Sequence, residues 1–216
     1  MAHSNQNHFE RELKIDLQNP QAFDLLLARF SWQGSPLLQY NYFFDTPEGF
    51  LRFHRYALRI RNENGRYLLT VKGPRLSTGD LVVRNEVECP LPSRIAEPLI
   101  NNPNLFFNFS LPPFQWLEEK TDKALKSFSL MQNLFFKNER HPVYLVTGEG
   151  QICLELDKTD YGSKELFYEL EAEFPDEEHY EKGRVLIAAV LQELGIPWKI
   201  SEMSKYAHGL ALKNKS

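Results

Sequence analysis

The chain begins with charged side chains whose spacing could support chemistry. Glu10, Glu12 and Lys14 lie two residues apart in a stretch that is otherwise typical of a strand. Because strand side chains alternate between faces, these three project from one side, while Leu13 and Ile15 point to the other. Two carboxylates and an ammonium along about 7 Å of one face suit a site that handles a metal and a charged substrate. The alternative is an ordinary solvated strand face, and this motif alone does not exclude it.

Ionised residues at the same two-residue spacing recur in nearly every later segment that is typical of a strand. They are Arg59 and Arg61, Lys72, the run Arg84, Glu86 and Glu88, the pair Glu155 and Asp157, and the run Glu169, Glu171 and Glu173. Each strand taken alone fits a solvated face. Carboxylates about 7 Å apart along a strand nevertheless repel one another unless a cation neutralises them. We therefore expect basic groups or a metal opposite the last run.

Turn residues divide the chain into closely spaced strands. We predict strands at 8–17, 37–45, 56–62, 66–73, 81–91, 131–140, 143–147, 151–158 and 166–174. The pair Asn64-Gly65 is typical of a hairpin turn, and further loops are expected at 77–80 and 148–150. This succession predicts a meander of antiparallel strands.

Two amphipathic helices are predicted to accompany the strands. The first covers 20–32 and begins after Asn19, and the second begins after Asp176 and ends at Gly195. Their expected apolar stripes are Phe23, Leu26, Leu27 and Phe30 in the first and Val185, Leu186, Ala189 and Leu194 in the second. A short helix should start near Ser204, and 92–126 should form short helices and loops.

Composition favours a single globular domain over 1–216, with disordered tails at 1–7 and 213–216. The net charge of −4 gives no electrostatic reason to expect a nucleic-acid partner. Cys89 and Cys153 lack metal-binding spacing, which fits a reducing cytoplasm, and no stretch approaches the roughly 20 apolar residues of a membrane span. The scattered histidines are expected at the surface rather than as ligands: His8, His54, His141, His179 and His208.

About eight antiparallel strands with one charged face can close into a barrel, with a polar lumen inside and the two amphipathic helices outside. The expected fold class is therefore α+β, an eight-stranded antiparallel closed β-barrel that forms a charged tunnel. Its basic residues should line one wall and its glutamates another. Basic side chains bind phosphate oxygens, and carboxylates bind Mg²⁺ or Mn²⁺. No phosphate-binding glycine loop or Ser-His-Asp set competes for the chemistry.

These residues belong to a longer ordered set of motifs. The set comprises Glu10-x-Glu12-x-Lys14, Phe43-Phe44-Asp45-Thr46-Pro47, Leu58-Arg59-Ile60-Arg61, Leu69-Thr70-Val71-Lys72-Gly73-Pro74, Arg84-Asn85-Glu86-Val87-Glu88, Arg140, Asp157, the run from Glu169 to Glu173, and Ser204-Lys205-Tyr206-Ala207-x-Gly209-Leu210. In this order the chain resembles the CYTH family, the triphosphate tunnel metalloenzymes, over residues 9–212. It looks most like the bacterial inorganic triphosphatases and thiamine-triphosphatase-like proteins of that family.

The resemblance implies a role for each charged group. Triphosphate would be bound by Lys14, Arg59, Arg61, Lys72, Arg84, Arg140 and Lys205. Mg²⁺ or Mn²⁺ would be bound by Glu169, Glu171, Glu173, Asp157, Glu86 and Glu88. Glu10 and Glu12 would be catalytic, because they would orient and deprotonate the attacking water or hold a second metal.

The chain departs from the family pattern at two positions. Cys153 stands where a glutamate is usual, although Glu155 shares its face and could substitute in part. His208 stands where an arginine is common. The departure at Cys153 favours the alternative of a polyphosphate-binding module with little turnover.

The implied reaction is hydrolysis of inorganic tripolyphosphate to pyrophosphate and phosphate. Thiamine triphosphate or a nucleoside triphosphate is an alternative substrate, and class IV-type adenylate cyclisation is an alternative reaction. The segment 92–126 would either pack against the barrel or cap one mouth of the tunnel. The protein would act as a monomer or homodimer.

Overall fold

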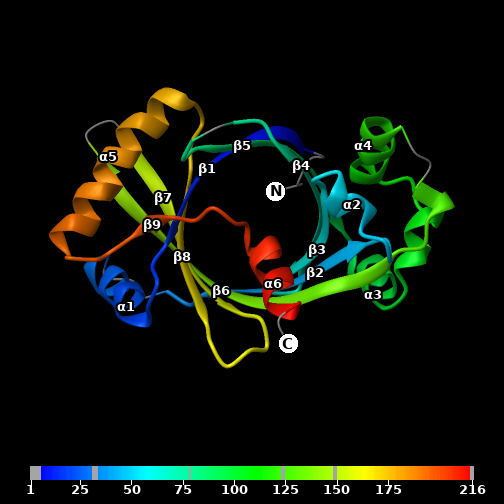
Figure 1. Ribbon diagram of the computed structural model, residues 1–216, viewed down its shortest axis with the longest axis horizontal. Coiled ribbons are helices and arrows are strands. Elements are labelled where there is room, and N and C mark those ends of the chain that lie inside the picture. The colour runs from blue at the N-terminus through cyan, green and yellow to red at the C-terminus, as the bar shows by residue number, and fades with distance from the viewer. Residues whose placement is uncertain (1–5, 31–33, 78, 123–124, 148–149, 215–216) are drawn as a thin grey trace.

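The computed structural model describes residues 6–30, 34–77, 79–122, 125–147 and 150–214, and in this part of the chain eight strands close into an antiparallel barrel (Figure 1). The strands are β1 (Gln6–Asp16), β2 (Leu37–Asp45), β3 (Ala57–Glu63), β4 (Arg66–Arg75), β5 (Val82–Leu91), β6 (Met131–Thr147), β7 (Gly150–Asp160) and β8 (Phe167–Glu173). They pair in the order β5-β4-β3-β2-β6-β7-β8-β1, and β1 pairs again with β5. The expected fold class is confirmed.

Strand β1 closes the barrel because different parts of its length pair with different neighbours. Its first part pairs with β5, where Glu10 lies opposite Arg84, and its last part pairs with β8, where Lys14 lies opposite Glu171. The two-residue strand β9 (Lys199–Ile200) extends the sheet along the end of β1. The opening charged motif therefore spans the seam of the barrel.

The barrel is polar inside and apolar outside. Leu58 and Ile60 of β3 are fully buried beneath the helices that cover the barrel, whereas Arg59 between them faces the lumen. The same alternation separates Leu69 and Val71 of β4 from the inward-facing residues of that strand. The apolar residues of the strands thus form the core with the helices and leave the lumen to charged groups.

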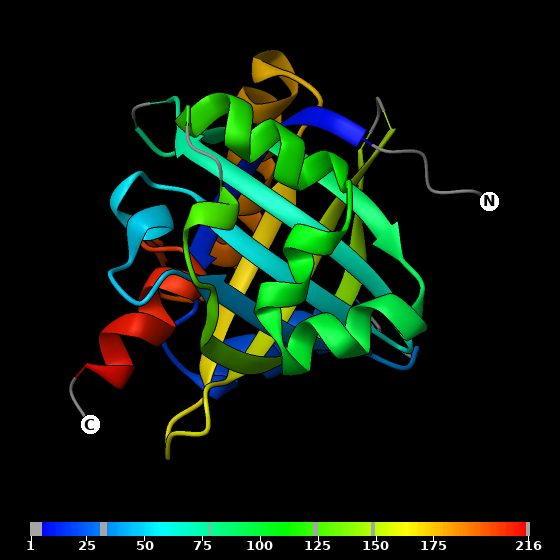
Figure 2. The ribbon, with the colours of Figure 1, turned by 90° about the vertical axis from the view of Figure 1, so that its right-hand side faces the viewer.

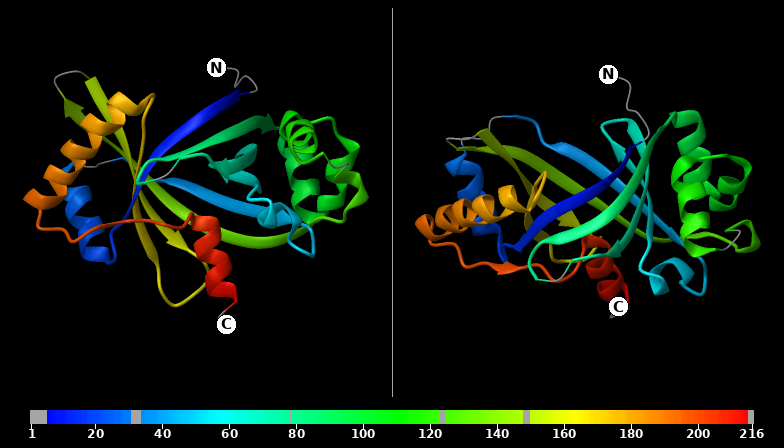
Figure 3. Two further views of the ribbon diagram at one scale, coloured as in Figure 1. Left: turned by 45° about the horizontal axis from the view of Figure 1, so that its top comes forward. Right: turned by 90° about the horizontal axis from the view of Figure 1, so that it is seen from above.

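Two helical groups cover opposite sides of the barrel (Figures 1 and 3). Helices α1 (Pro20–Arg29) and α5 (Glu177–Glu193) pack on one side, and α3 (Ser93–Asn101), the 3₁₀ helix η1 (Pro103–Asn108) and α4 (Pro112–Thr121) pack on the other (Figure 2). Shorter helices are α2 (Phe50–Phe53), η2 (Leu125–Ser127) and α6 (Lys205–Lys213). The described residues of 92–126 pack on the outer face, and none lines the lumen cavity.

The predicted turn and cap residues act as expected. Asn19 Oδ1 accepts a hydrogen bond from the Ala22 N–H at 2.9 Å, Asp176 Oδ1 accepts from the His179 N–H at 2.9 Å, and Ser204 Oγ accepts from the Ala207 N–H at 3.2 Å. In the hairpin between β3 and β4, Asn64 has a φ of 50° and Gly65 a φ of 85°, which is the conformation that Asn-Gly favours.

The predicted apolar stripe of α5 is wrong at three of its four residues, since only Leu194, at the end of the helix, packs against the core. Val185 is 61% exposed and Leu186 39% exposed, and Ala189 is also exposed. The buried side of the helix is instead formed by Tyr180, Gly183, Ile187 and Leu191. Gly183 belongs to this side because it lets the ring of Phe174 approach the helix backbone, and a glycine carries no hydrophobic signal in the sequence.

The prediction of separate strands at 131–140 and 143–147 is also wrong, because β6 continues through Pro142. Its pairing with β2 ends at Arg140, and beyond that point β7 is its only partner among the described strands. A proline can occupy a strand where one edge has no partner, since its missing N–H then costs no ladder hydrogen bond.

Some expectations fall partly or wholly outside the described residues. The tail predicted at 1–7 overlaps the start of β1 and the tail predicted at 213–216 overlaps the end of α6, while residues 1–5 and 215–216 are not described. The predicted loops at 77–80 and 148–150 and the predicted end of the first helix at 32 also include undescribed positions. None of the described helices is long and apolar enough to cross a membrane.

We predict that Gly183→Ala destabilises the protein. A Cβ at this position would overlap the Phe174 ring, and overpacking a core costs about 1–3 kcal/mol. Chemical denaturation should therefore show a lower free energy of unfolding. Arg184→Ala, on the exposed side of the same helix, should change it by less than about 0.5 kcal/mol; equal effects of the two substitutions would contradict the packing described here.

Candidate functional site

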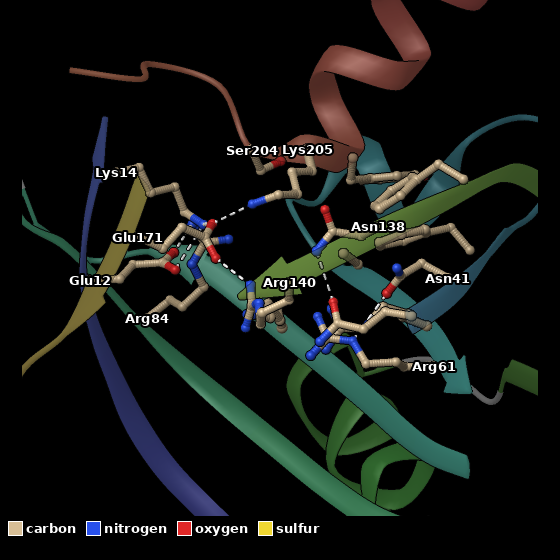
Figure 4. A pocket seen from close by; sticks show the side chains of 17 residues that line it. Glu12, Lys14, Asn41, Arg61, Arg84, Asn138, Arg140, Glu171, Ser204 and Lys205 are labelled. Carbon is tan, nitrogen blue, oxygen red and sulfur yellow. Dashed lines mark hydrogen bonds and ion pairs between the residues drawn. The ribbon is translucent and has the colours of Figure 1, made fainter. Parts of the chain in front are cut away.

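The barrel lumen contains a polar cavity at the junction of β1 to β6, β8 and α6 (Figure 4). Its empty volume is about 590 Å³, part of it open to solvent. Nine of the predicted site residues line it: Glu12, Lys14, Arg59, Arg61, Lys72, Arg84, Arg140, Glu171 and Lys205. Others are buried in the layer around it, namely Glu10, Glu86, Asp157 and Glu169. Glu88 is half-buried, and Glu173 lies at an exposed edge.

Lys205 supplies the positive charge that was expected opposite the closely spaced carboxylates of the Glu169 to Glu173 run. It lies at the first position of α6, and its Nζ is 2.8 Å from Asp157 Oδ2, 2.5 Å from Glu169 Oε2 and 2.9 Å from Glu171 Oε1. Burial opposes the charge of Lys205, but these carboxylates raise its pKa well above the usual value. The cap at Ser204 fixes the helix start and so holds this ammonium in the lumen.

Arg140 connects β6 to the same carboxylates. Its Nε donates to Asp157 Oδ1 at 2.8 Å, and its Nη2 donates to Asp157 Oδ2 at 2.6 Å and to Glu171 Oε2 at 2.7 Å. Its Nη1 contacts Glu155. Burial acts to raise the pKa of Glu171, but Lys14, Lys205 and Arg140 hold that pKa well below its usual range. Glu171 is therefore an ionised carboxylate at neutral pH.

The opening motif forms a second set of ion pairs. Lys14 contacts Glu171 and lies 2.8 Å from Glu12 Oε2, while Arg84 lies 3.2 Å from Glu12 Oε1. Lys72 Nζ lies 2.5 Å from Glu10 Oε1 and 2.9 Å from Glu86 Oε2. The expectation of one basic and one acidic wall is therefore wrong. Cations and carboxylates alternate because buried like charges would repel one another.

Arg59 and Arg61 are less well compensated than the other basic groups. Arg59 lies 3.9 Å from Glu86 Oε1 and donates to Thr70 Oγ1 at 3.3 Å, and its buried Nε has no hydrogen-bond partner in the part of the chain that the structure describes. Burial, together with Arg59 and Arg140, lowers the pKa of Arg61 to about 10. The group still carries its charge at neutral pH, so this part of the lumen has an excess of positive charge that favours an anion.

Sequence reasoning missed the neutral amides of the lumen. Gln39 Nε2 donates to Glu63 Oε2 at 2.7 Å, and Asn138 Nδ2 donates to Gln39 Oε1 at 3.0 Å and to Asp157 Oδ1 at 2.9 Å. Asn41 Oδ1 accepts from Arg61 Nε at 3.1 Å. The sequence did contain a signal for these amides, namely the two-residue spacing of the charged residues. Gln39 and Asn41 on β2 have this spacing, as do Asn138 and Arg140 on β6.

The carboxylates offer suitable chemistry for a hard divalent cation, which prefers oxygen ligands. Glu10 Oε2 and Glu169 Oε1 are buried and accept no hydrogen bond from any described residue. Glu173 lies at the exposed edge of this group, where partial desolvation of its carboxylate, and then repulsion from Glu155 and Glu10, raises its pKa to about 7. No three acidic, imidazole or thiol side chains among the described residues converge on one ion position, since the carboxylates point to lysines and arginines. A metal ion bound here would therefore require these pairs to exchange partners.

The two departures from the family pattern affect the site differently. Cys153 is half-buried, and burial followed by Glu155 raises the pKa of its thiol; Glu155 supplies the carboxylate that meets Arg140. The His208 ring stacks on Phe167 with centroids 4.4 Å apart, and His208 is not among the residues that line the cavity.

The expectation of surface histidines is wrong for His141. Its ring is buried, its Nε2 lies 2.9 Å from Glu139 Oε1, and it packs edge-on against Phe23 with ring centroids 5.6 Å apart. Because its neighbour Arg140 points into the lumen, His141 faces the outer core beneath α1, where an aromatic ring packs well.

Comparisons with known proteins agree with this geometry. A family model described as the CYTH domain matches residues 8–205. A Hippeastrum protein named HpAC1, an adenylyl cyclase candidate described as revealing a dominant triphosphatase activity, is 28% identical in sequence, with 94% of this chain and 95% of that chain covered and a TM-score of 0.82.

Two further solved structures share the fold. An adenylate cyclase candidate from Bacillus halodurans is 21% identical, with 91% of this chain and 96% of that chain covered and a TM-score of 0.66. The PH1819 protein from Pyrococcus horikoshii is 20% identical, with coverages of 96% and 99% and a TM-score of 0.59. At these identities the likeness concerns the architecture alone.

We predict that Arg140→Met destabilises the protein by about 3–5 kcal/mol, because it leaves Asp157, Glu155 and Glu171 buried with less positive charge. Chemical denaturation measures the loss. The matched control is Arg29→Met, since Arg29 and Glu193 form an exposed pair 3.7 Å apart and such pairs contribute at most about 1 kcal/mol. A loss no larger than that of the control would contradict the burial argument.

Glu173 should make stability depend on pH. Its pKa in the folded protein is about 7, above the ordinary 4.5, so the unfolded chain releases this proton first. Its contribution to stability is therefore fully present below about pH 4.5 and is lost as the pH rises towards 7. In EDTA, Glu173→Gln should raise the melting temperature at about pH 8 and leave it unchanged at about pH 4.5. Glu165→Gln, in an exposed loop, is the control, and parallel pH profiles for Glu173→Gln and the wild type would refute the assignment.

Proposed function

The chain belongs to the CYTH domain family, and we propose that it hydrolyses a triphosphate in its barrel lumen with the help of a divalent metal ion. The observation that carries the proposal is the excess positive charge at Arg59 and Arg61, directly beside a buried set of carboxylates. The triphosphatase activity described for the Hippeastrum protein supports the same reaction class.

Binding would proceed by exchange of ion-pair partners. Phosphate oxygens would first meet Arg59 and Arg61, whose charges are least compensated. They would then replace carboxylates as partners of the other cations, since charge-assisted hydrogen bonds to phosphate are about as strong as those to carboxylate. The proposed substrate-binding set is Lys14, Arg59, Arg61, Lys72, Arg84, Arg140 and Lys205.

The carboxylates released in this exchange would be free for Mg²⁺ or Mn²⁺. Glu169, Glu171 and Asp157 are the main proposed ligands because they share the ammonium of Lys205, with Glu173, Glu86 and Glu88 as the outer members of the set. The ion would supply Lewis-acid stabilisation of charge on the phosphoryl oxygens.

Glu10 and Glu12 are proposed to act on the attacking water. Glu10 Oε2 is buried and has no hydrogen-bond partner among the described residues, so it can accept a hydrogen bond from water and then its proton. The water oxygen would attack the terminal phosphorus in line, the bridging P–O bond would break, and pyrophosphate would leave. Arginines around the cavity would stabilise the charge that develops on the phosphoryl oxygens.

Inorganic tripolyphosphate is the proposed substrate, because the cavity is lined mainly by charged and amide groups. Its aromatic residues pack on one another: Phe43 stacks on Tyr206 at 4.5 Å and on Phe136 at 5.5 Å between ring centroids. These faces are therefore engaged rather than open to the organic part of thiamine triphosphate or a nucleotide, which remain the alternative substrates.

We predict that the protein releases orthophosphate and pyrophosphate from tripolyphosphate in Mg²⁺ or Mn²⁺, and not in EDTA. Ion chromatography of parallel incubations with tripolyphosphate, thiamine triphosphate and ATP shows which of these substrates the protein hydrolyses. Cyclic AMP from ATP would favour adenylate cyclisation. Tight binding of tripolyphosphate without turnover would favour a polyphosphate-binding module and contradict the hydrolase proposal.

Two substitutions should separate the metal and phosphate roles. Glu171→Gln should lower kcat by at least about 100-fold, because a proposed metal ligand is lost, while circular dichroism shows the fold retained. Arg59→Ala should raise KM by about tenfold or more with a smaller change in kcat, and Arg66→Ala at the exposed hairpin should change neither. An unchanged rate for Glu171→Gln would overturn the metal assignment, and unchanged kinetics for Arg59→Ala would overturn the phosphate assignment.

A further inference from the structure

Ion pairs in this lumen follow a cross-strand rule. Four basic residues lie directly opposite a carboxylate on the neighbouring strand: Arg84 opposite Glu10, Lys14 opposite Glu171, Lys72 opposite Glu86, and Arg140 opposite Asp157. Each of these pairs is also an ion pair between side chains. Directly opposite positions bring side chains into contact, so the register itself neutralises these cations.

The two arginines of β3 do not follow this rule. Arg59 lies opposite Phe43 and Thr70 but is still 3.9 Å from Glu86 Oε1, whereas Arg61 forms no ion pair with any carboxylate of the described residues. The residue opposite Arg61, on β2, is Asn41. Asn41 Oδ1 accepts a hydrogen bond from Arg61 Nε at 3.1 Å. Figure 4 shows this contact at the end of the cavity away from Lys14 and Glu171. The arginine is thus held in place by a neutral group.

The hydrogen bond at Nε also directs the rest of the guanidinium. Asn41 is 1% exposed, so its amide is fixed by its surroundings. With Nε bound to it, the two terminal nitrogens of Arg61 are left for the cavity, which both residues line. Those two nitrogens are the donors with which an arginine binds phosphate in a bidentate manner.

We propose that Asn41 is a positioning residue that sets the affinity of the site for phosphate. Its amide orients Arg61 as a carboxylate would, and because the amide is neutral it leaves the charge of Arg61 to the substrate. This inference rests on the proposed function, since the ligand is a phosphoryl group of the triphosphate. An aspartate at position 41 has nearly the same shape and would satisfy the cross-strand rule, at the expense of anion binding.

The test is Asn41→Asp, with KM and kcat for tripolyphosphate measured in Mg²⁺ and the melting temperature measured without ligand. We expect KM to rise by about tenfold or more, kcat to stay within about threefold of the wild type, and the melting temperature to stay equal or rise through the new ion pair. A merely structural role for Asn41 would instead link weaker binding to a lower melting temperature.

Asn62→Asp is the matched control. Asn62 follows Arg61 on β3, points to the opposite face, and uses its Oδ1 to accept from the Gly65 N–H at 2.8 Å, which an aspartate can also do. It adds the same charge one residue away but outside the lumen, so KM should not change. A KM for Asn41→Asp within about threefold of this control, or a rise that comes only with a lower melting temperature, would overturn the proposal.

Two further measurements distinguish a failure of this inference from a failure of the proposed function. If Asn41→Asp does not fold, Asn41→Ala removes the acceptor for Arg61 Nε and should still raise KM, so an unchanged KM there overturns the proposal. The rise in melting temperature with saturating tripolyphosphate reports binding without turnover. If the wild type shows neither turnover nor this rise in melting temperature, the proposed function has failed. If the wild type shows both and Asn41→Asp has the same KM as the wild type, only this inference has failed.

Discussion

A charged side chain buried without a partner costs several kcal/mol, and this constraint governs the whole barrel. The lumen holds basic and acidic groups from strands far apart in the sequence, so the barrel is stable only when closure brings them together. The seam shows this most clearly, because β1 carries Glu10 to Arg84 on one neighbour and Lys14 to Glu171 on the other. The apolar residues of the strands must then face outward, which explains why helices cover the barrel on both sides.

The same constraint suggests how such a lumen could work on a triphosphate. A network of matched ion pairs resists loss of any one member, but it can exchange partners when a polyanion and a cation enter together, because each charge keeps a counter-charge. Arg61 differs, since a neutral amide holds it. A site with every cation matched would favour its own carboxylates over phosphate, and the less compensated arginines Arg59 and Arg61 shift that balance toward the ligand.

Much of the fold could be predicted from local sequence, because period-two alternation and turn residues report directly on strands. Those signals predicted the closed barrel, its charged lumen and the helix caps at Asn19, Asp176 and Ser204. Features that depend on strand partners could not be predicted in this way. Strand β6 passes through Pro142 because none of the described strands pairs with one of its edges there, and cations alternate with carboxylates because of a register that spans the chain. The contribution of Asn41 likewise depends on Arg61 lying opposite it.

Partner exchange in the lumen is the central claim of this account, and a crystal structure with tripolyphosphate and Ca²⁺, a divalent ion chosen to slow turnover, tests it most directly. The account predicts triphosphate in the lumen with phosphate oxygens on Arg59 and Arg61, and Glu171 turned from Arg140 toward the ion. Triphosphate bound outside the barrel, or a lumen whose ion pairs are all retained with the ligand bound, would contradict it.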